Sequence, residues 1–167
     1  MGDTLNRKLR VRLPLFDCLL DADPDAPPDP PLTAQLALER LRRAVRRDVE
    51  AVLNARRRRL PTPPHLTELA VSPVGYGVPD PTAGSFTEED LRIALAREME
   101  VALRRFEPRL FNVQVTLAPL PRGTDATTDR TMHLRIDAFL RTDQVPEPIT
   151  FDTALRPITL DVAVRED

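Results

Sequence analysis

An acid, a proline and a base stand together at Glu107, Pro108 and Arg109, where a helical pattern ends and an alternating pattern begins. Proline disfavours helical geometry in the residue before it, so the helix should end at or before Glu107. A carboxylate just past a helix C-terminus meets the negative end of the helix dipole and needs a cation or donor nearby. If the segment is extended, side chains 107 and 109 point to the same side. The two charges then either pair with each other or are presented together to a partner.

Residues for other kinds of chemistry are scarce or scattered. The two histidines, His65 and His133, are far from the only cysteine, Cys18, so no Cys/His cluster suggests a metal site. No Gly-x-Ser-x-Gly nucleophile elbow is present, and the turn at Gly75-Tyr76-Gly77 lacks the Gly-Lys-Ser/Thr of a phosphate loop. We therefore expect neither a metal nor a cofactor, and no enzymatic activity.

A glycoside hydrolase is the one enzyme class with a conceivable pair of groups. Such an enzyme needs two placed carboxylates, for which Glu107 together with Asp137 or Asp152 are the candidates. Sugar sites also usually stack aromatic rings on the ligand, and the sequence has no Trp and one Tyr. Hydrolysis of the cell wall is therefore a disfavoured alternative that a turnover assay would test.

The first long helix is predicted over residues 32–59, because apolar residues recur there at helical spacing. The stripe consists of Leu38, Leu41, Val45, Val49 and Val52. We expect the arginine run 56–59 to close this helix, where positive charge suits the dipole. The remaining face is rich in arginine, which fits a solvated surface, an acidic protein partner or nucleic acid. The net charge of −2 gives no general attraction to nucleic acid.

A second long helix is predicted over residues 85–106, with Thr87 as its N-cap. Its expected buried stripe is Leu91, Leu95, Met99, Ala102 and Phe106. The proline-broken loop 60–84 joins the two helices. Gly75 and Gly77 permit positive φ or close backbone approach in this loop, and we expect a packed turn there with Tyr76 in the core.

Strand patterns fill the remainder of the sequence. Alternation predicts strands over residues 111–117 and 132–138, and residues 149–153 form a short strand or a turn. A last alternating segment, 158–164, closes the sheet or offers an edge for strand addition by another chain. The expected inward residues of the three alternating strands are Phe111, Val113, Val115, Leu117, Met132, Leu134, Ile136, Ala138, Ile158, Leu160, Val162 and Val164. The predicted fold is α+β, with two long helices packed on a small, mostly antiparallel sheet.

A short amphipathic arm precedes this body. Leu15, Phe16, Leu19 and Leu20 share one helical face. A helix this short is marginal alone, so it must dock either on its own domain or on a partner. Residues 21–31 alternate proline and acid and predict a semi-rigid linker. The predicted organisation is an arm and linker over residues 1–31 and an α+β domain over residues 32–167.

The compartment is predicted from what the sequence lacks. The N-terminal segment has bases without a following apolar region, unlike a secretory signal, and the single cysteine fits a reducing environment. No apolar run reaches the ~20 residues that a membrane span requires. These features predict a cytoplasmic protein.

Four sequence segments together resemble the GPW/gene-25-like family of baseplate wedge proteins, and within it the TssE branch of bacterial type VI secretion. The segments are Leu-Phe-Asp-x-Leu-Leu at 15–20, the arginine-rich run 41–57, the Val-Gly-Tyr-Gly-Val-Pro-Asp turn at 74–80 and Phe-Glu-Pro-Arg-Leu at 106–110. Phe151-Asp152-Thr153 also fits, so that the resemblance spans roughly residues 13 to 155. Gly75 replaces the more usual asparagine of the turn, and both residues tolerate positive φ.

The resemblance implies a structural part of a contractile machine, although some relatives carry a lysozyme-like description. Its Glu-Pro-Arg motif, here Glu107, Pro108 and Arg109, is linked in the family to holding the baseplate together and to starting sheath assembly. The implied partners are the wedge subunits TssF, TssG and TssK and the sheath proteins TssB and TssC, the latter by strand addition. We expect the arm residues Leu15, Phe16 and Leu19 to bind a partner as well. Alternatives are a phage-tail or related injection machine, or a regulatory adaptor of the same fold.

Overall fold

The computed structural model describes residues 11, 13–19, 33–58, 63–80, 89–119, 131–143, 145–156 and 161–166. In chain order its elements are helices α1 (Leu15–Leu19) and α2 (Ala34–Asn54), 3-10 helices η1 (Thr67–Val71) and η2 (Pro73–Gly75), helix α3 (Glu89–Phe106), and strands β1 (Leu110–Leu117), β2 (Met132–Leu140), β3 (Glu147–Leu155) and β4 (Val162–Glu166). The predicted linker 21–31, the predicted cap Thr87, and Leu20, Ile158 and Leu160 lie outside the described residues.

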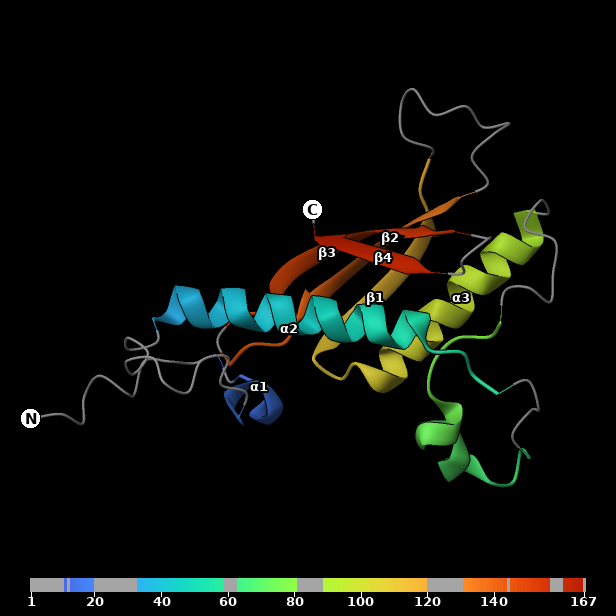
Figure 1. Cartoon of the computed structure of the whole chain (residues 1–167), viewed down its shortest axis with the longest axis horizontal. Coiled ribbons are helices and arrows are strands. Elements are labelled where there is room, and N and C mark those ends of the chain that lie inside the picture. The colour runs from blue at the N-terminus through green and yellow to red at the C-terminus, as the bar shows by residue number, and fades with distance from the viewer. Residues whose placement is uncertain are drawn as a thin grey trace, which may run out of the picture.

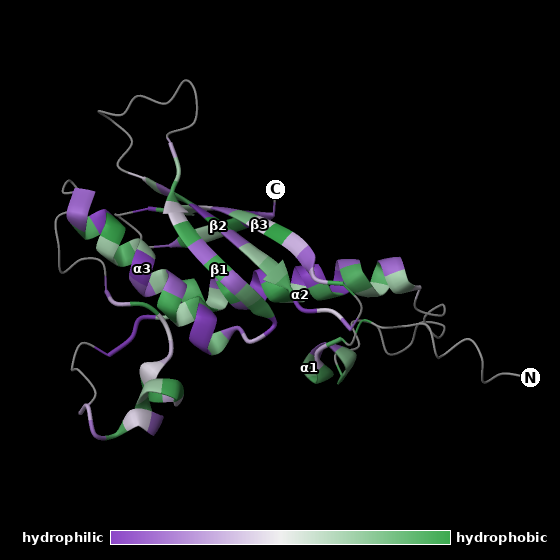
Figure 2. Cartoon of the chain, turned by 180° about the vertical axis from the view of Figure 1, so that it is seen from behind, coloured by the Kyte–Doolittle hydropathy of each residue, from purple (hydrophilic) through white to green (hydrophobic). Residues whose placement is uncertain are grey.

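The four strands form one antiparallel sheet in the order β1-β2-β3-β4. Helix α2 crosses one face of this sheet and α3 runs beside β1, while α1 lies apart below α2 (Figure 1). Viewed from behind, the strands mix apolar and polar residues along their length (Figure 2), because alternate side chains point to opposite faces. The predicted α+β fold is confirmed. The segment at 149–153 is part of a nine-residue strand in which Phe151 is fully buried.

Helix α2 buries the predicted stripe but is shorter than predicted. Thr33 caps its N-terminus by accepting a hydrogen bond from the Leu36 N–H. The helix ends at Asn54, and Arg56 instead forms an isolated parallel bridge with Val78. This bridge requires Gly77, which has a φ of 95° and whose Cβ, if present, would lie 2.3 Å from the Ala55 carbonyl oxygen. The prediction that the arginine run closes the helix is therefore wrong for residues 56–58, because the backbone pairs with Val78 there; Arg59 lies outside the described residues.

Helix α3 ends at Phe106, as the proline rule predicted. Leu95, Met99 and Ala102 are buried, whereas Leu91 is exposed, so the predicted stripe does not reach the first turn. The Phe106 ring packs edge-on against Tyr76 at a centroid distance of 5.1 Å. Tyr76 therefore sits at the border of the core rather than fully inside it.

One predicted inward residue of β1 points the other way. The pairing of β1 with β2 shifts register between Phe111 and Gln114, and Asn112 has a φ of 51°. A bulge of this kind reverses the alternation locally. Phe111 consequently stacks on Phe139 at 5.7 Å, and Leu110 takes the buried position.

Candidate functional site

The Glu-Pro-Arg motif forms a tight turn between α3 and β1. The Glu107 N–H donates to the Leu103 carbonyl at 2.9 Å, and the Leu110 N–H donates to the Glu107 carbonyl at 3.1 Å. The Glu107 carboxylate accepts hydrogen bonds from the Arg109 backbone N–H at 3.2 Å and from Arg109 Nε at 2.6 Å. It accepts a further one from Arg109 Nη2. The acid and the base therefore pair within the chain, through a turn and not through an extended segment.

The Glu107 carboxylate is buried, with a residue exposure of 1%. Burying a charge costs much free energy unless the charge is paired and hydrogen-bonded. Arg109, whose side chain is 24% exposed, supplies that pairing. Burial acts to lower the pKa of Arg109, but its hydrogen bonds to Glu107 and Asp48 raise that pKa overall and keep the guanidinium charged.

Asp48 of α2 extends the pair into a network. Its Oδ2 accepts a hydrogen bond from Arg109 Nη2 at 2.6 Å, and its Oδ1 accepts one from Arg47 Nε at 2.9 Å. Burial acts to raise the pKa of Asp48, yet these two hydrogen bonds outweigh burial and lower it. One carboxylate thus stands between two guanidinium groups from different elements.

The network continues to α1. Both carboxylate oxygens of Asp17 accept hydrogen bonds from the two terminal nitrogens of Arg47. These bonds and those to Asp48 raise the pKa of Arg47. Five side chains from α1, α2 and the junction therefore alternate in sign, and we refer to them as the ionic network: Glu107, Arg109, Asp48, Arg47 and Asp17.

Sequence reasoning singled out Glu107 and Arg109 but not the other members of the network. The available signal was weak. Asp48 directly precedes Val49 and follows Val45 by three residues, which places it at the border of the buried stripe of α2. A carboxylate at such a border inside an arginine run is a candidate for a tertiary ion pair, but the pattern names no partner.

The predicted partner-binding residues of α1 are exposed. Leu15, Phe16 and Leu19 have exposures of 76%, 64% and 73%. Among the described residues, α1 is attached to the body through Asp17, and the preceding Val11 and Leu13 pack against the core. Helix α1 thus docks on its own domain by its polar side and leaves its apolar face open. Helix α1 is separate from the Glu-Pro-Arg motif, and the ionic network connects the two.

Side chains of the helices occupy both edges of the sheet. The Asn54 amide of α2 donates to the Val162 carbonyl at 2.9 Å and accepts from the Val162 N–H at 2.8 Å, and Arg46 donates to the Val164 carbonyl. At the opposite edge, Glu100 of α3 accepts from the Val115 N–H at 3.1 Å. Arg104 of α3 donates there to the Val113 carbonyl at 2.8 Å. Strand β4 therefore closes the sheet with an edge that α2 partly covers.

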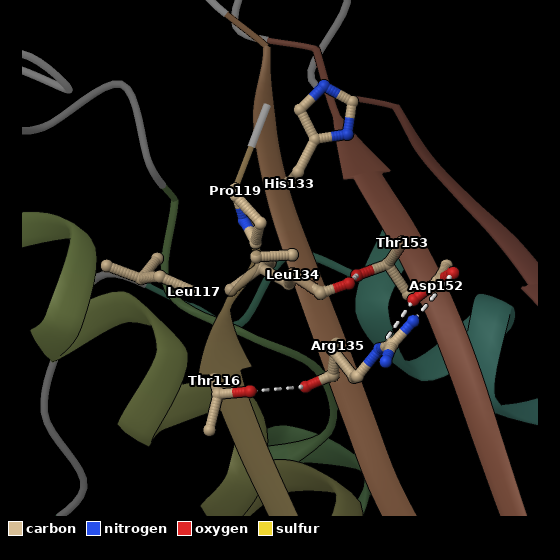
Figure 3. Close-up of a pocket in the computed structure, with 9 residues that line it drawn as sticks. Thr116, Leu117, Pro119, His133, Leu134, Arg135, Asp152 and Thr153 are labelled. Atoms are coloured by element: carbon tan, nitrogen blue, oxygen red, sulfur yellow. Dashed lines mark hydrogen bonds and ion pairs between the residues drawn. The ribbon is translucent and has the colours of Figure 1, made fainter. Parts of the chain in front are cut away.

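The carboxylates considered for hydrolysis do not converge. Asp137 and Asp152 alternate with buried residues of β2 and β3 and so point away from the core. Asp152 pairs with Arg135 at 3.0 Å beside a pocket of about 390 Å³ (Figure 3), and Asp137 accepts a hydrogen bond from the Thr150 hydroxyl. Glu107 is tied through Arg109 to α2, on the helix side of the sheet. The pairs of carboxylates considered for the disfavoured hydrolase alternative, Glu107 with either aspartate, are therefore not brought together.

The described residues also bear on metal binding and on membrane insertion. No group of three or more His, Cys, Asp or Glu side chains that could hold a metal ion occurs in the described ranges. None of the helices described is both long and apolar enough to cross a membrane.

A match to a protein-family model identifies the family of the chain. Residues 39–145, more than half of the chain, match the family model described as baseplate wedge protein gp25. The chain belongs to this family. The match includes most of α2, all of α3, the Glu-Pro-Arg motif, β1 and β2. It therefore covers four of the five members of the ionic network, and only Asp17 lies outside it. Neither the curated proteins nor the solved structures give a match.

Membership of the gp25 family makes the chain a structural wedge protein of a baseplate of the phage-tail type. The resemblance inferred from four short segments is confirmed at this level. The match begins within α2, so the arm with Leu15, Phe16 and Leu19 lies outside the region that the family model covers.

Proposed function

We propose that this gp25-family protein is the wedge subunit of a type VI secretion baseplate, a member of the TssE branch, present in several copies in a ring assembly. The observation that carries the proposal is the Glu107–Arg109 pair. Its carboxylate is buried, its guanidinium is anchored to α2 through Asp48, and both residues lie inside the matched region. In this proposal the protein acts from the cytoplasm, where the baseplate assembles against the inner membrane.

The docking surface for TssF, TssG and TssK has two parts. The first is the motif, where Pro108 is exposed and Arg109 is partly exposed beside the buried Glu107. The second is the apolar face of α1, formed by Leu15, Phe16 and Leu19. Aliphatic and aromatic side chains at helical spacing are the usual anchors of a helix in an apolar groove. An exposed proline next to a fixed guanidinium offers a rigid, directional contact.

The contact to the sheath proteins TssB and TssC is proposed to use strand addition at an edge of the sheet. An incoming strand needs free backbone N–H and C=O groups along that edge. It must therefore replace the hydrogen bonds that Asn54 and Arg46 make at β4, or those that Glu100 and Arg104 make at β1. Capped edges keep the sheet from pairing before the sheath subunit arrives.

Co-expression with TssF and TssG tests the wedge role. The wild-type chain is expected to co-purify with both, and a Leu15→Ser/Phe16→Ser/Leu19→Ser variant is expected to lose most of that capture. Leu91→Ser is the matched control, because Leu91 is also an exposed leucine but lies on α3. Equal capture by wild type and the triple variant contradicts the proposed role of α1.

Sheath polymerisation in cells tests the motif. A Glu107→Ala/Arg109→Ala variant is expected to abolish sheath assembly, and normal assembly with this variant contradicts the proposed role. If the wild-type chain captures no type VI subunit but captures wedge proteins of a phage tail, the coarser family assignment stands and the type VI proposal falls.

A further inference from the structure

The ionic network joins two features that the proposed function treats separately. At one end Glu107 is held in the turn between α3 and β1, and at the other Asp17 lies on the short helix α1. Between them, Arg109 Nη2 contacts Asp48 Oδ2, and Arg47 Nε contacts Asp48 Oδ1. Asp48 is therefore the only member that touches an arginine from the junction and the arginine that holds α1.

The attachment of α1 depends strongly on that arginine. A five-residue helix is not stable by itself, and no residue of α1 is buried. Its large apolar side chains face outward, so they contribute nothing to docking on the body. Among the described residues, α1 makes its side-chain hydrogen bonds to the body between Asp17 and Arg47.

Asp48 fixes the direction in which Arg47 points. The guanidinium of Arg47 is planar and presents Nε on one side and its terminal nitrogens on another. With Nε bound to Asp48, the terminal nitrogens face Asp17 and bind both of its oxygens. The Arg47 side chain is 47% exposed. Without the hydrogen bond to Asp48 it would therefore be free to adopt many rotamers.

We propose that Asp48 is a positioning residue that couples α1 to the Glu-Pro-Arg motif, so that the apolar face of α1 and the motif are presented as one docking unit. The buried Glu107 fixes Arg109, Arg109 fixes Asp48, Asp48 orients Arg47, and Arg47 holds α1. The coupling itself is a property of the isolated chain, and only its use in partner docking rests on the proposed function.

The single cysteine allows a direct test. Cys18 is exposed on α1 and is the only cysteine in the sequence, so a nitroxide spin label on it reports the mobility of α1 in the purified full chain. The reference states are the wild type, with α1 held, and Arg47→Ala, with α1 released. Asp48→Ala is expected to raise the label mobility to the level of Arg47→Ala, and the Asp48→Ala/Arg47→Ala double variant is expected to be no more mobile than either single variant.

Glu50→Ala is the matched control. Glu50 lies on the same helix, is exposed to a similar extent as Asp48 (38% and 35% of the side chain), and pairs with Arg46 outside the network. Its removal is expected to leave the label as immobile as in the wild type. Circular dichroism of each variant separates release of α1 from loss of the fold.

Arg109→Lys tests whether a change in the Glu-Pro-Arg motif alters the mobility of α1. Lysine keeps the charge but has no fork to bind Glu107 and Asp48 together, so the label mobility is expected to lie between that of the wild type and that of Arg47→Ala. A folded Asp48→Ala variant with the wild-type spectrum overturns the proposal, as does an Arg47→Ala variant with an immobile label. A chain that passes these tests but captures no TssF or TssG refutes the proposed function alone.

Discussion

Two acid–arginine pairs stand at opposite ends of the ionic network and have the same chemistry in different surroundings. In Glu107–Arg109 the side-chain exposures are 2% and 24%, and in Asp17–Arg47 they are 20% and 47%. Breaking a buried pair leaves an uncompensated charge in the core, whereas an exposed pair is solvated by water when broken. Losing one partner of the first pair should therefore destabilise the fold strongly, whereas the second pair positions a helix at little gain in stability.

The largest expected effect is that of Arg109→Ala, which removes the partner of the buried carboxylate. We expect a loss of about 3–5 kcal/mol in the free energy of unfolding, the usual cost of leaving a buried charge unpaired. Urea denaturation measures it. Arg105→Ala is the control, because Arg105 is exposed and donates to the Ala70 carbonyl, outside the ionic network.

A double variant sharpens this result. Glu107→Met/Arg109→Met removes both charges and is expected to be more stable than Arg109→Ala, because replacing a buried ion pair by apolar groups is often neutral. If Arg109→Ala costs no more than Arg105→Ala, the carboxylate does not depend on its arginine and the contrast between the two pairs disappears.

The next largest effect concerns an uncharged contact between α2 and the sheet. Asn54→Leu removes both hydrogen bonds to Val162 and is expected to cost about 1–3 kcal/mol, because a backbone donor and acceptor lose their partners. Unlike an exposed ion pair, this loss should be independent of salt.

The same variant exposes part of the β4 edge, so we expect concentration-dependent self-association, measured by light scattering. Ala51→Leu, at an exposed position one turn earlier on α2, serves as the control for added apolar surface. A monomeric Asn54→Leu variant at all concentrations would show that the edge needs no cap.

A smaller effect is expected on the single tyrosine. Burial raises the pKa of Tyr76 above its ordinary value of 10.0, and the nearby carboxylates Asp48 and Glu107 raise it further. A raised pKa means that the neutral phenol stabilises the fold below pH 10 and that this contribution is lost as pH rises through the folded pKa.

Asp48→Asn should therefore lower the pKa of Tyr76 while leaving it above the ordinary value, because burial remains. The ultraviolet absorbance of tyrosinate measures it without interference, since the chain has one Tyr and no Trp. Asp152→Asn, on the far face of the sheet, is the control. An unchanged Tyr76 titration in Asp48→Asn would contradict the electrostatic effect of Asp48 on Tyr76.

The smallest effect is expected for Asp17→Ala. An exposed pair contributes about 0.2–1 kcal/mol, so the thermal midpoint should move little, and less still in high salt. The apolar face of α1 should nevertheless lose its fixed position, which the spin label at Cys18 detects. A large loss of stability in Asp17→Ala would make the two pairs equivalent and contradict the comparison.

Rules that relate neighbouring residues were sufficient to predict much of the secondary structure. The end of α3 at Phe106 follows from Pro108 alone, because the steric restriction acts on the preceding residue. The buried stripe of α2 and the alternation of β2 follow from side-chain periodicity. The pairing of Glu107 with Arg109 could also be anticipated, because only Pro108 separates the two residues in the sequence.

Tertiary structure decided what these local features contact. Asn54 meets Val162 across 108 positions of sequence and Arg109 meets Asp48 across 61, and neither spacing carries a periodic signal. The same holds for the bulge at Asn112 that turns Phe111 outward and for the Val78 bridge that ends α2 early. The sequence by itself determined the elements, the family and the acid–base motif, because these depend on neighbouring residues. Only the packing of α2 against the junction and α1 determined that Asp48 connects them, because a charged group finds its partner only once the surrounding apolar faces have been buried.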